Sequence, residues 1–164
     1  ISPEHLSEIQ RMALVNRCIG KAYSLLARRA HSEWELRRKL SGSFDEDAVD
    51  QAIAQAKELS FLDDTRYAAD LAEELLRLKH YAPSRIRAEL LKRGVSRDDA
   101  DSALATLDFD AQRELLFLLT EKLVWDPSDE KDRKRVFLSL QRLGYSYYDI
   151  QDAMNDFPRK EEDE

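Results

Sequence analysis

The sequence predicts an all-α protein, built as an elongated, curved solenoid of three tandem three-helix repeats that an N-terminal helix precedes. Two observations predict this fold class. Apolar residues recur three and four positions apart, and no stretch alternates apolar and polar residues as a strand would. The sign of the local charge also alternates three times along the chain, which indicates an internal repeat. Because a single three-helix unit cannot bury its apolar face alone, we expect the repeats to stack.

Alignment of the chain with itself supports the repeat. A shift of 50 residues places the second copy on the third without a gap, and equivalent positions carry the same kind of residue: Ile86 and Val136, Leu90 and Leu140, Gly94 and Gly144. The first copy fits once a missing residue is allowed near Gly42. Each glycine follows a helix, where a left-handed backbone is common and glycine adopts it at low cost. We therefore expect Gly42, Gly94 and Gly144 to play one role.

The repeat divides the chain into five segments: an N-terminal helix at 1–18, three-helix repeats at 19–62, 63–107 and 108–157, and an acidic tail at 158–164. The N-terminal helix starts at Ser2 and Pro3 and runs toward the first repeat. The long leading helices of the repeats are expected at about 19–30, 64–80 and 108–125. A middle helix and a third helix follow each of them.

Capping residues mark where these helices begin. Ser32 and Glu35 form a capping box before the first middle helix, and Pro83 suits the first turn of the second. Asp63 and Asp64 are expected to cap the second leading helix. The third helices follow N-cap residues, each preceded by an apolar residue: Asp45, Ser96 and Ser146. Carboxylates three residues on, at Asp99 and Asp149, are expected to accept hydrogen bonds from free N–H groups there.

Composition excludes several classes of protein. Of 164 residues, 43% are hydrophobic and 36% are charged, and the net charge of -7 argues against a protein that coats DNA by overall positive charge. The longest apolar run, Leu115–Leu119, is far too short to span a membrane. Ile1–His5 lacks a basic segment followed by an apolar core, so we expect a cytoplasmic protein without membrane contact. Cys18 has no second cysteine with which to form a disulfide.

Catalysis finds little support in the sequence. His5, His31 and His80 stand alone, outside any zinc-binding motif, and the glycines are scattered singly rather than gathered in a phosphate-binding loop. Helix capping accounts for Asp63 and Asp64 better than metal binding does. Cys18 is interpreted as a small packed residue. We therefore expect no enzyme, no metal and no cofactor.

Basic residues in and beside the middle helices are the candidate binding residues: Arg28, Arg29, Arg37, Arg38, Lys39, Arg85, Arg87, Lys92, Arg93, Lys134, Arg135 and Arg142. Equivalent helices of a solenoid line one side, so these cations are expected to form one basic stripe. Such a stripe attracts phosphates or an acidic protein surface. The alternative is that these cations pair with neighbouring acids on solvated faces and contribute little.

Aromatic residues offer further candidates. Trp34, Tyr145, Tyr147 and Tyr148 are candidates for stacking on bases or anchoring a partner, and Trp34 and Tyr148 stay open between that role and packing. Tyr145 occupies the position equivalent to Val95 before an N-cap and is expected in the core. Trp125 is expected to pack against the last repeat.

Four segments, taken together, resemble the bacterial RecX regulators: residues 28–40, 59–68, 86–95 and 143–150. The resemblance covers about residues 20–157 in order. It implies an all-helical crescent that binds the RecA recombinase filament in its groove and restrains its ATPase and strand-exchange activities, with affinity for DNA in certain members. This chain departs from the family where Leu143 replaces the arginine usual before Gly144, and where Ser41 replaces a basic residue before Gly42.

The preferred hypothesis is thus a monomeric regulator that binds the RecA filament through the basic stripe. A second hypothesis is a protein that binds single- or double-stranded DNA directly and competes with the recombinase. A helical-repeat scaffold for an unrelated protein is the third.

Overall fold

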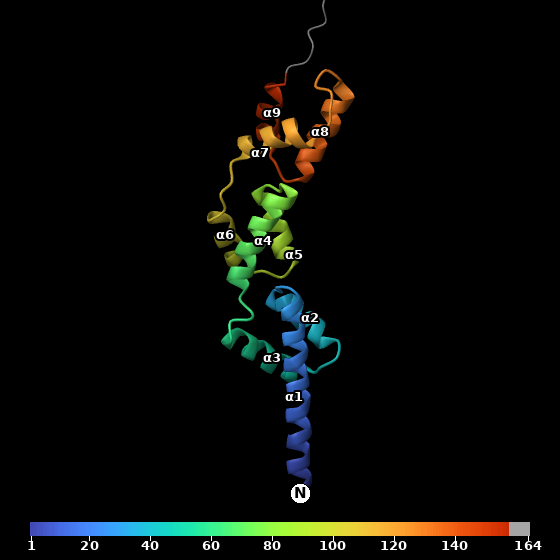
Figure 1. Ribbon diagram of the computed structural model, residues 1–164, viewed down its shortest axis with the longest axis vertical. Coiled ribbons are helices and arrows are strands. Elements are labelled where there is room, and N and C mark those ends of the chain that lie inside the picture. The colour runs from blue at the N-terminus through green and yellow to red at the C-terminus, as the bar shows by residue number, and fades with distance from the viewer. Residues whose placement is uncertain (158–164) are drawn as a thin grey trace, which may run out of the picture. The chain divides into compact units, whose positions relative to one another are not determined.

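Helices make up all the regular secondary structure of residues 1–157, the part of the chain that the computed structural model describes (Figure 1). In chain order they are α1 (Pro3–Arg28), α2 (Glu33–Ser41), α3 (Glu46–Glu58), α4 (Asp64–Lys79), α5 (Pro83–Lys92), α6 (Arg97–Ala105), α7 (Ala111–Phe117) with the π-helical turn η1 (Leu118–Lys122), α8 (Glu130–Arg142) and α9 (Tyr147–Asn155). The prediction of an all-α fold is therefore confirmed. The predicted acidic tail lies outside the described residues.

The described chain forms two compact units. The first contains residues 1–70 and 90–103, and the second contains residues 71–89 and those from 104 onward. Helices α4, α5 and α6 therefore each give residues to both units. The repeat boundaries drawn from the sequence stay predictions.

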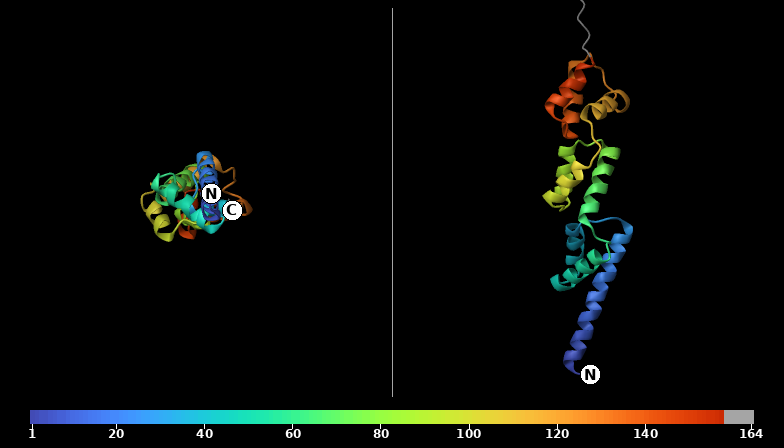
Figure 2. Two further views of the ribbon diagram at one scale, coloured as in Figure 1. Left: turned by 90° about the horizontal axis from the view of Figure 1, so that it is seen from below. Right: turned by 90° about the vertical axis from the view of Figure 1, so that its left-hand side faces the viewer.

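In the first unit, α1 packs along α3 and α2. The core begins at Val15, and Cys18 and Ala22 are fully buried against α2 and α3. The buried Cys18 confirms its interpretation as a packed residue. Residues before Val15 are not buried, and the first turns of α1 extend past α2 and α3 (Figures 1 and 2). The N-terminal helix and the first leading helix are thus one continuous helix.

In the second unit, α7, α8 and α9 enclose a core that includes Leu115, Leu140 and Ile150, each fully buried. Trp125 packs against this core, and its Nε1 donates to the Leu119 carbonyl at 3.0 Å, which confirms the predicted packing. The leading helix, predicted to reach residue 125, instead changes to a π turn at Leu118 and ends at Lys122. The extended residues that follow let Trp125 fold back onto the helix.

Most predicted caps are present. The side chains of Asp45, Ser96 and Ser146 accept the N–H groups of the residues three positions later. Asp63 accepts the N–H of Arg66 at the start of α4. Asp64, however, accepts the N–H of Glu33 at 2.8 Å, so it caps α2 rather than its own helix. The Asp99 carboxylate accepts the Thr65 hydroxyl at 2.9 Å rather than a helix N–H.

The three equivalent glycines do not share one conformation. Gly94 and Gly144 have φ of +82° and +101°, as predicted, but Gly42 is right-handed with φ of -68°. The prediction for Gly42 is therefore wrong. The turn after α2 closes through hydrogen bonds from Ser43 and Phe44 to the Leu40 carbonyl, and this geometry needs no positive φ.

Candidate functional site

Within the first unit, the start of α2 packs on the turn that follows α5. The Ser32 side chain is fully buried, and its hydroxyl donates to the Arg93 carbonyl at 2.5 Å. A Cβ on Gly94 would lie 2.3 Å from the Trp34 Cβ, so only glycine permits this approach. We call this contact between the start of α2 and the turn after α5 a joint. It brings together Trp34 and Arg93, which are distant in sequence.

The second unit contains an equivalent joint between the start of α5 and the turn after α8. The Ala82 N–H donates to the Leu143 carbonyl at 2.9 Å, and the Ser84 hydroxyl donates to the Gly144 carbonyl at 2.6 Å. The 50-residue shift relates Ser32 to Ala82, and likewise the residues before the two glycines. The sequence repeat thus appears as a repeated contact, once in each unit.

Several predicted cations of the first unit are occupied by contacts within it. Arg29 pairs with Glu35 at 2.6 Å, and Arg37 pairs with Asp50 at 2.5 Å. The Lys39 ammonium lies 2.9 Å from Nε2 of His31. For Arg29 and Arg37, the alternative of pairing with neighbouring acids describes the structure.

Other cations of the first unit remain available. Arg38 is exposed and lies over the Trp34 ring, 4.7 Å from its centroid, and Trp34 itself is 42% exposed. Arg28 and Lys92 are exposed, and neither forms an ion pair within the described residues. Trp34 therefore has two roles. Its Cβ packs against Gly94 in the joint, and its ring lies at the surface.

In the second unit the structure brings Arg85 and Arg142 together. The Arg85 guanidinium donates to the Arg142 carbonyl at 3.0 Å and lies over the Tyr81 ring. Arg135 pairs with Asp132 at 2.6 Å and donates to the Val124 carbonyl. Arg85 and Arg135 therefore hold the unit together. The half-buried Arg87, and Arg93 of the first unit, are also engaged in interactions.

Two predicted cations of the second unit project freely. Lys134 and Arg142 are exposed on α8, and neither side chain forms an ion pair within residues 1–157. The neighbouring Arg133 differs, because its guanidinium donates to the carbonyls of Pro127, Met154 and Phe157. The predicted stripe draws cations from both units and stays a prediction.

A buried polar cluster underlies the cations at the start of α2. His31 is buried; its Nδ1 lies 2.9 Å from the Arg29 carbonyl, and burial lowers the pKa of His31. A neutral ring that donates from Nδ1 can accept from Lys39 at Nε2. Burial alone would raise the pKa of Glu35, but hydrogen bonds from Tyr67 and Arg29 outweigh it and lower that pKa. Short-range spacing does not reveal this cluster, because Tyr67 reaches Glu35 from 32 residues away.

The aromatic residues separate into core and surface. Tyr145 is buried, as predicted, and its hydroxyl donates to the His80 carbonyl at 2.8 Å. Tyr148 is 78% exposed. Sequence reasoning missed the neighbouring Phe137 and Leu138 on α8; comparison with the equivalent positions of the earlier repeats could have found Phe137.

Other features of the described residues bear on chemistry. No group of three or more His, Cys, Asp or Glu in residues 1–157 is arranged to hold a metal ion. Burial raises the pKa of the Cys18 thiol. Among the helices of the same residues, none combines the length and apolar character needed to cross a membrane.

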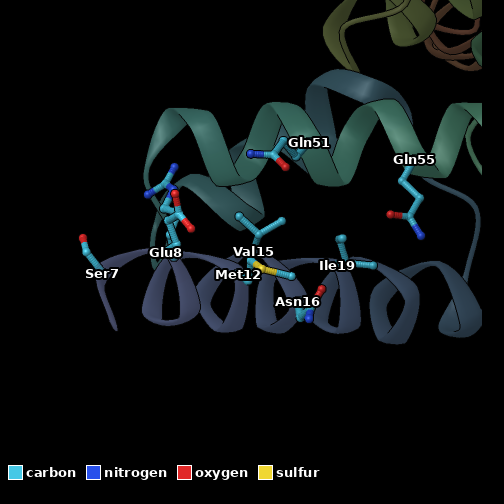
Figure 3. Close-up of a pocket in the computed structure, with 9 residues that line it drawn as sticks. Ser7, Glu8, Met12, Val15, Asn16, Ile19, Gln51 and Gln55 are labelled. Atoms are coloured by element: carbon cyan, nitrogen blue, oxygen red, sulfur yellow. The ribbon is translucent and has the colours of Figure 1, made fainter. Parts of the chain in front are cut away.

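A groove of about 720 Å³ lies between α1 and α3 (Figure 3). Figure 3 shows Met12, Val15 and Ile19 of α1 on one side and Gln51 and Gln55 of α3 on the other. None of the predicted cations lines it. The groove is therefore separate from the predicted binding residues.

Solved structures share this fold. The crystal structure of RecX from Lactobacillus salivarius matches with a TM-score of 0.71 and 18% identity, covering 89% of this chain and 97% of that one. A second crystal structure, of a regulatory protein RecX, matches with a TM-score of 0.75 and 17% identity, covering 94% of this chain and 78% of that one.

Sequence comparisons identify the family. The model of the first three-helix domain of RecX matches residues 18–55, and that of the second matches residues 63–104. The regulatory protein RecX of Cronobacter sakazakii is 33% identical over 159 residues, which cover 90% of this chain and 96% of the relative. The protein of the same name from Clostridium botulinum is 26% identical over 162 residues, covering 95% of this chain and 76% of the relative. With the repeated three-helix fold, these matches show that the chain belongs to the RecX family of regulatory proteins.

Proposed function

We propose that this chain is a monomeric, cytoplasmic, non-enzymatic regulator that binds the RecA–DNA filament and mainly inhibits its ATPase and strand-exchange activities. The observation that carries this proposal is membership of a family whose named relatives are regulatory proteins. The RecA filament is proposed as the partner because the sequence resembles that family. The available cations supply a means of binding it.

The contacts are proposed to involve the cations that the fold leaves available. Arg28, Arg38 and Lys92 serve in the first unit, and Lys134 and Arg142 serve in the second. A cation without an intramolecular ion pair can pair with an acidic partner without breaking a native ion pair, whereas Arg37 would first have to leave Asp50. Several weak contacts carried by one chain bind with greater avidity than any contact alone.

Direct binding to DNA is the competing function, because phosphates would attract the same cations. The net charge of -7 opposes it. The test must therefore measure binding with and without the recombinase.

The first experiment titrates the chain into the cognate recombinase on single-stranded DNA, and follows ATP hydrolysis at low and high salt. Binding to the same DNA without recombinase is measured alongside. We expect inhibition at amounts well below one chain per recombinase subunit, without matching affinity for bare DNA. Equal affinity for bare DNA would instead establish competition, and no effect in either assay would refute both functions.

A charge-reversal variant tests the residues. Arg38→Glu combined with Lys92→Glu is expected to raise the concentration for half-inhibition about tenfold, since two interfacial charge contacts are lost. The matched control is Arg17→Glu with Lys21→Glu, which changes the net charge equally at two exposed positions of α1. Far-UV circular dichroism should be unchanged in both. Equal loss in the two variants would mean that only overall charge matters.

A further inference from the structure

Three aromatic rings form one group on α8 and α9 of the second unit, with Phe137 half-buried and the two tyrosines exposed. The ring centroids of Phe137 and Tyr147 are 5.3 Å apart, and those of Tyr147 and Tyr148 are 5.5 Å apart. Tyr147 is 53% exposed, Tyr148 is 78% exposed, and Leu138 beside Phe137 is 40% exposed. We refer to Phe137, Tyr147 and Tyr148 as the aromatic patch.

The chain's own repeats show that the fold does not require aromatic residues here. The position of Phe137 is occupied by Arg37 in the first repeat and by Arg87 in the second. Arg37 pairs there with Asp50 of α3. The position of Asp50 becomes Gln151 in the last repeat, and the Gln151 amide lies 3.2 Å from the Tyr147 hydroxyl.

The two tyrosines also replace charged residues. Their positions hold Glu46 and Asp47 in the first repeat and Arg97 and Asp98 in the second. At four equivalent positions, the last repeat thus exchanges charged side chains for neutral ones, three of them aromatic. A face that is charged in the earlier repeats has become apolar and aromatic.

Packing of the last repeat does not account for this change. The core of the last repeat includes Val136, Leu140, Ile150 and Ala153, all of them buried. Phe137 packs only partly against this core, and the two tyrosines are largely in solvent. Clustered apolar surface of this kind typically marks a contact with another protein, and tyrosine is enriched among the residues that dominate such contacts.

Charges around the aromatic patch indicate the chemistry of the partner. Lys134 and Arg142 lie four residues before and after Leu138, on one face of α8, and both are exposed without an ion pair in the described residues. On α9, the carboxylates of Asp149 and Asp152 lie close to the tyrosines in sequence and disfavour a phosphate backbone. An uncharged centre with two cations at its edge complements a protein surface that has an apolar depression and carboxylates at its rim.

We propose that the aromatic patch is the anchor of this chain on its protein partner. Tyr147 and Tyr148, with Phe137 beside Tyr147, enter an apolar depression on the partner, while Lys134 and Arg142 pair with acids at its rim. This inference rests on the proposed function, which makes the partner a recombinase subunit in the filament. The patch adds apolar contacts to a site otherwise built from cations.

The test compares binding of labelled chains to recombinase filaments on single-stranded DNA and to the same DNA alone. Tyr147→Ser combined with Tyr148→Ser is expected to bind the filament about 30-fold more weakly, because anchor residues of this kind dominate an interface. Tyr147→Phe with Tyr148→Phe keeps the rings and should retain most of the affinity. The matched control is Arg97→Ser with Asp98→Ser, an exposed pair at the equivalent positions of the second repeat whose removal leaves the net charge unchanged.

The outcomes separate this inference from the proposed function. If the unaltered chain binds the filament and the serine variant binds equally well, the anchor is refuted and the proposed function stands. If the unaltered chain neither binds nor inhibits the filament, both fail. Two further results would overturn the protein anchor: an equal loss of affinity for bare DNA, which would assign the patch to nucleic acid, and a dimer in sedimentation that the serine variant dissociates, which would assign it to a second copy.

Discussion

Gly94 is held by two constraints that act independently. Its φ of +82° disfavours any residue with a Cβ, and the Trp34 side chain occupies the space that a Cβ would need. The joint between α2 and the turn after α5 therefore depends on this residue. Gly20, in contrast, lies within α1 and has nothing near its missing Cβ.

Gly94→Ala is accordingly expected to destabilise the protein by about 3 kcal/mol, from backbone strain and overpacking together. Gly20→Ala should instead stabilise it by about 0.8 kcal/mol, because alanine has a higher helix propensity than glycine. Urea unfolding followed by circular dichroism measures both. Similar effects of the two substitutions on stability would contradict the conclusion that the joint depends on Gly94.

We expect stability to depend on pH through His31. Since burial lowers its pKa below the ordinary 6.5, the folded chain binds fewer protons at this site than the unfolded chain. The stability associated with neutral His31 is present above pH 6.5 and is lost as the pH falls toward the folded pKa. Arg29 and Lys39 disfavour the protonated ring, while Glu35 favours it.

Stability is expected to decrease when the pH is lowered from above 6.5 to below it, and His31→Gln is expected to make this decrease smaller. Thermal unfolding at the two pH values measures it, with His5→Gln at the exposed N-terminus as the control. A pH dependence that His31→Gln leaves unaltered would show that another group titrates.

At the scale of elements, one serine both starts a helix and joins it to another. The Ser32 oxygen accepts the Glu35 N–H as an N-cap of α2, and the same hydroxyl donates to the Arg93 carbonyl. Ser146 caps α9 in the same way, through the Asp149 N–H, but is exposed. Comparing the two serines therefore separates the contribution of the N-cap from that of the hydrogen bond to the Arg93 carbonyl.

Ser32→Ala is expected to cost about 2 kcal/mol, from the lost N-cap and from a part-buried Arg93 carbonyl that loses the Ser32 hydroxyl. Ser146→Ala should cost about 1 kcal/mol, from the cap alone. The free energy of unfolding in urea gives both values. If the two costs are equal, the bond to Arg93 contributes nothing.

At the scale of the whole molecule, binding should combine a salt-dependent and a salt-independent part. Exposed cations are screened over about 10 Å at 0.1 M salt, whereas apolar contacts are not weakened in this way. Filament affinity of the unaltered chain is therefore expected to fall as salt rises.

The two binding variants should then differ in how their filament affinity depends on salt. Arg38→Glu with Lys92→Glu is expected to flatten the salt dependence, while Tyr147→Ser with Tyr148→Ser lowers affinity at every salt concentration without changing the slope. Titrations at several salt concentrations provide the comparison. An equal change of slope in both would show that the two surfaces are not distinct.

Sequence alone determined the features that rest on short spacings or on comparison of the chain with itself. The capping serines, the left-handed Gly94 and Gly144 and the buried Tyr145 all belong to this class. Helix periodicity and a 50-residue repeat encode them directly, because each depends on neighbours within a turn or on an equivalent position in another copy.

Only the tertiary structure decided which cations are available. Arg37 and Lys92 look alike in sequence, yet Arg37 meets Asp50 across two helices while Lys92 remains in solvent. Arg85 donates to the Arg142 carbonyl, 57 residues away, and Asp64 caps a helix other than its own. Such contacts depend on how side chains of separate helices meet when the core packs, and the spacing within one helix carries no information about that distance.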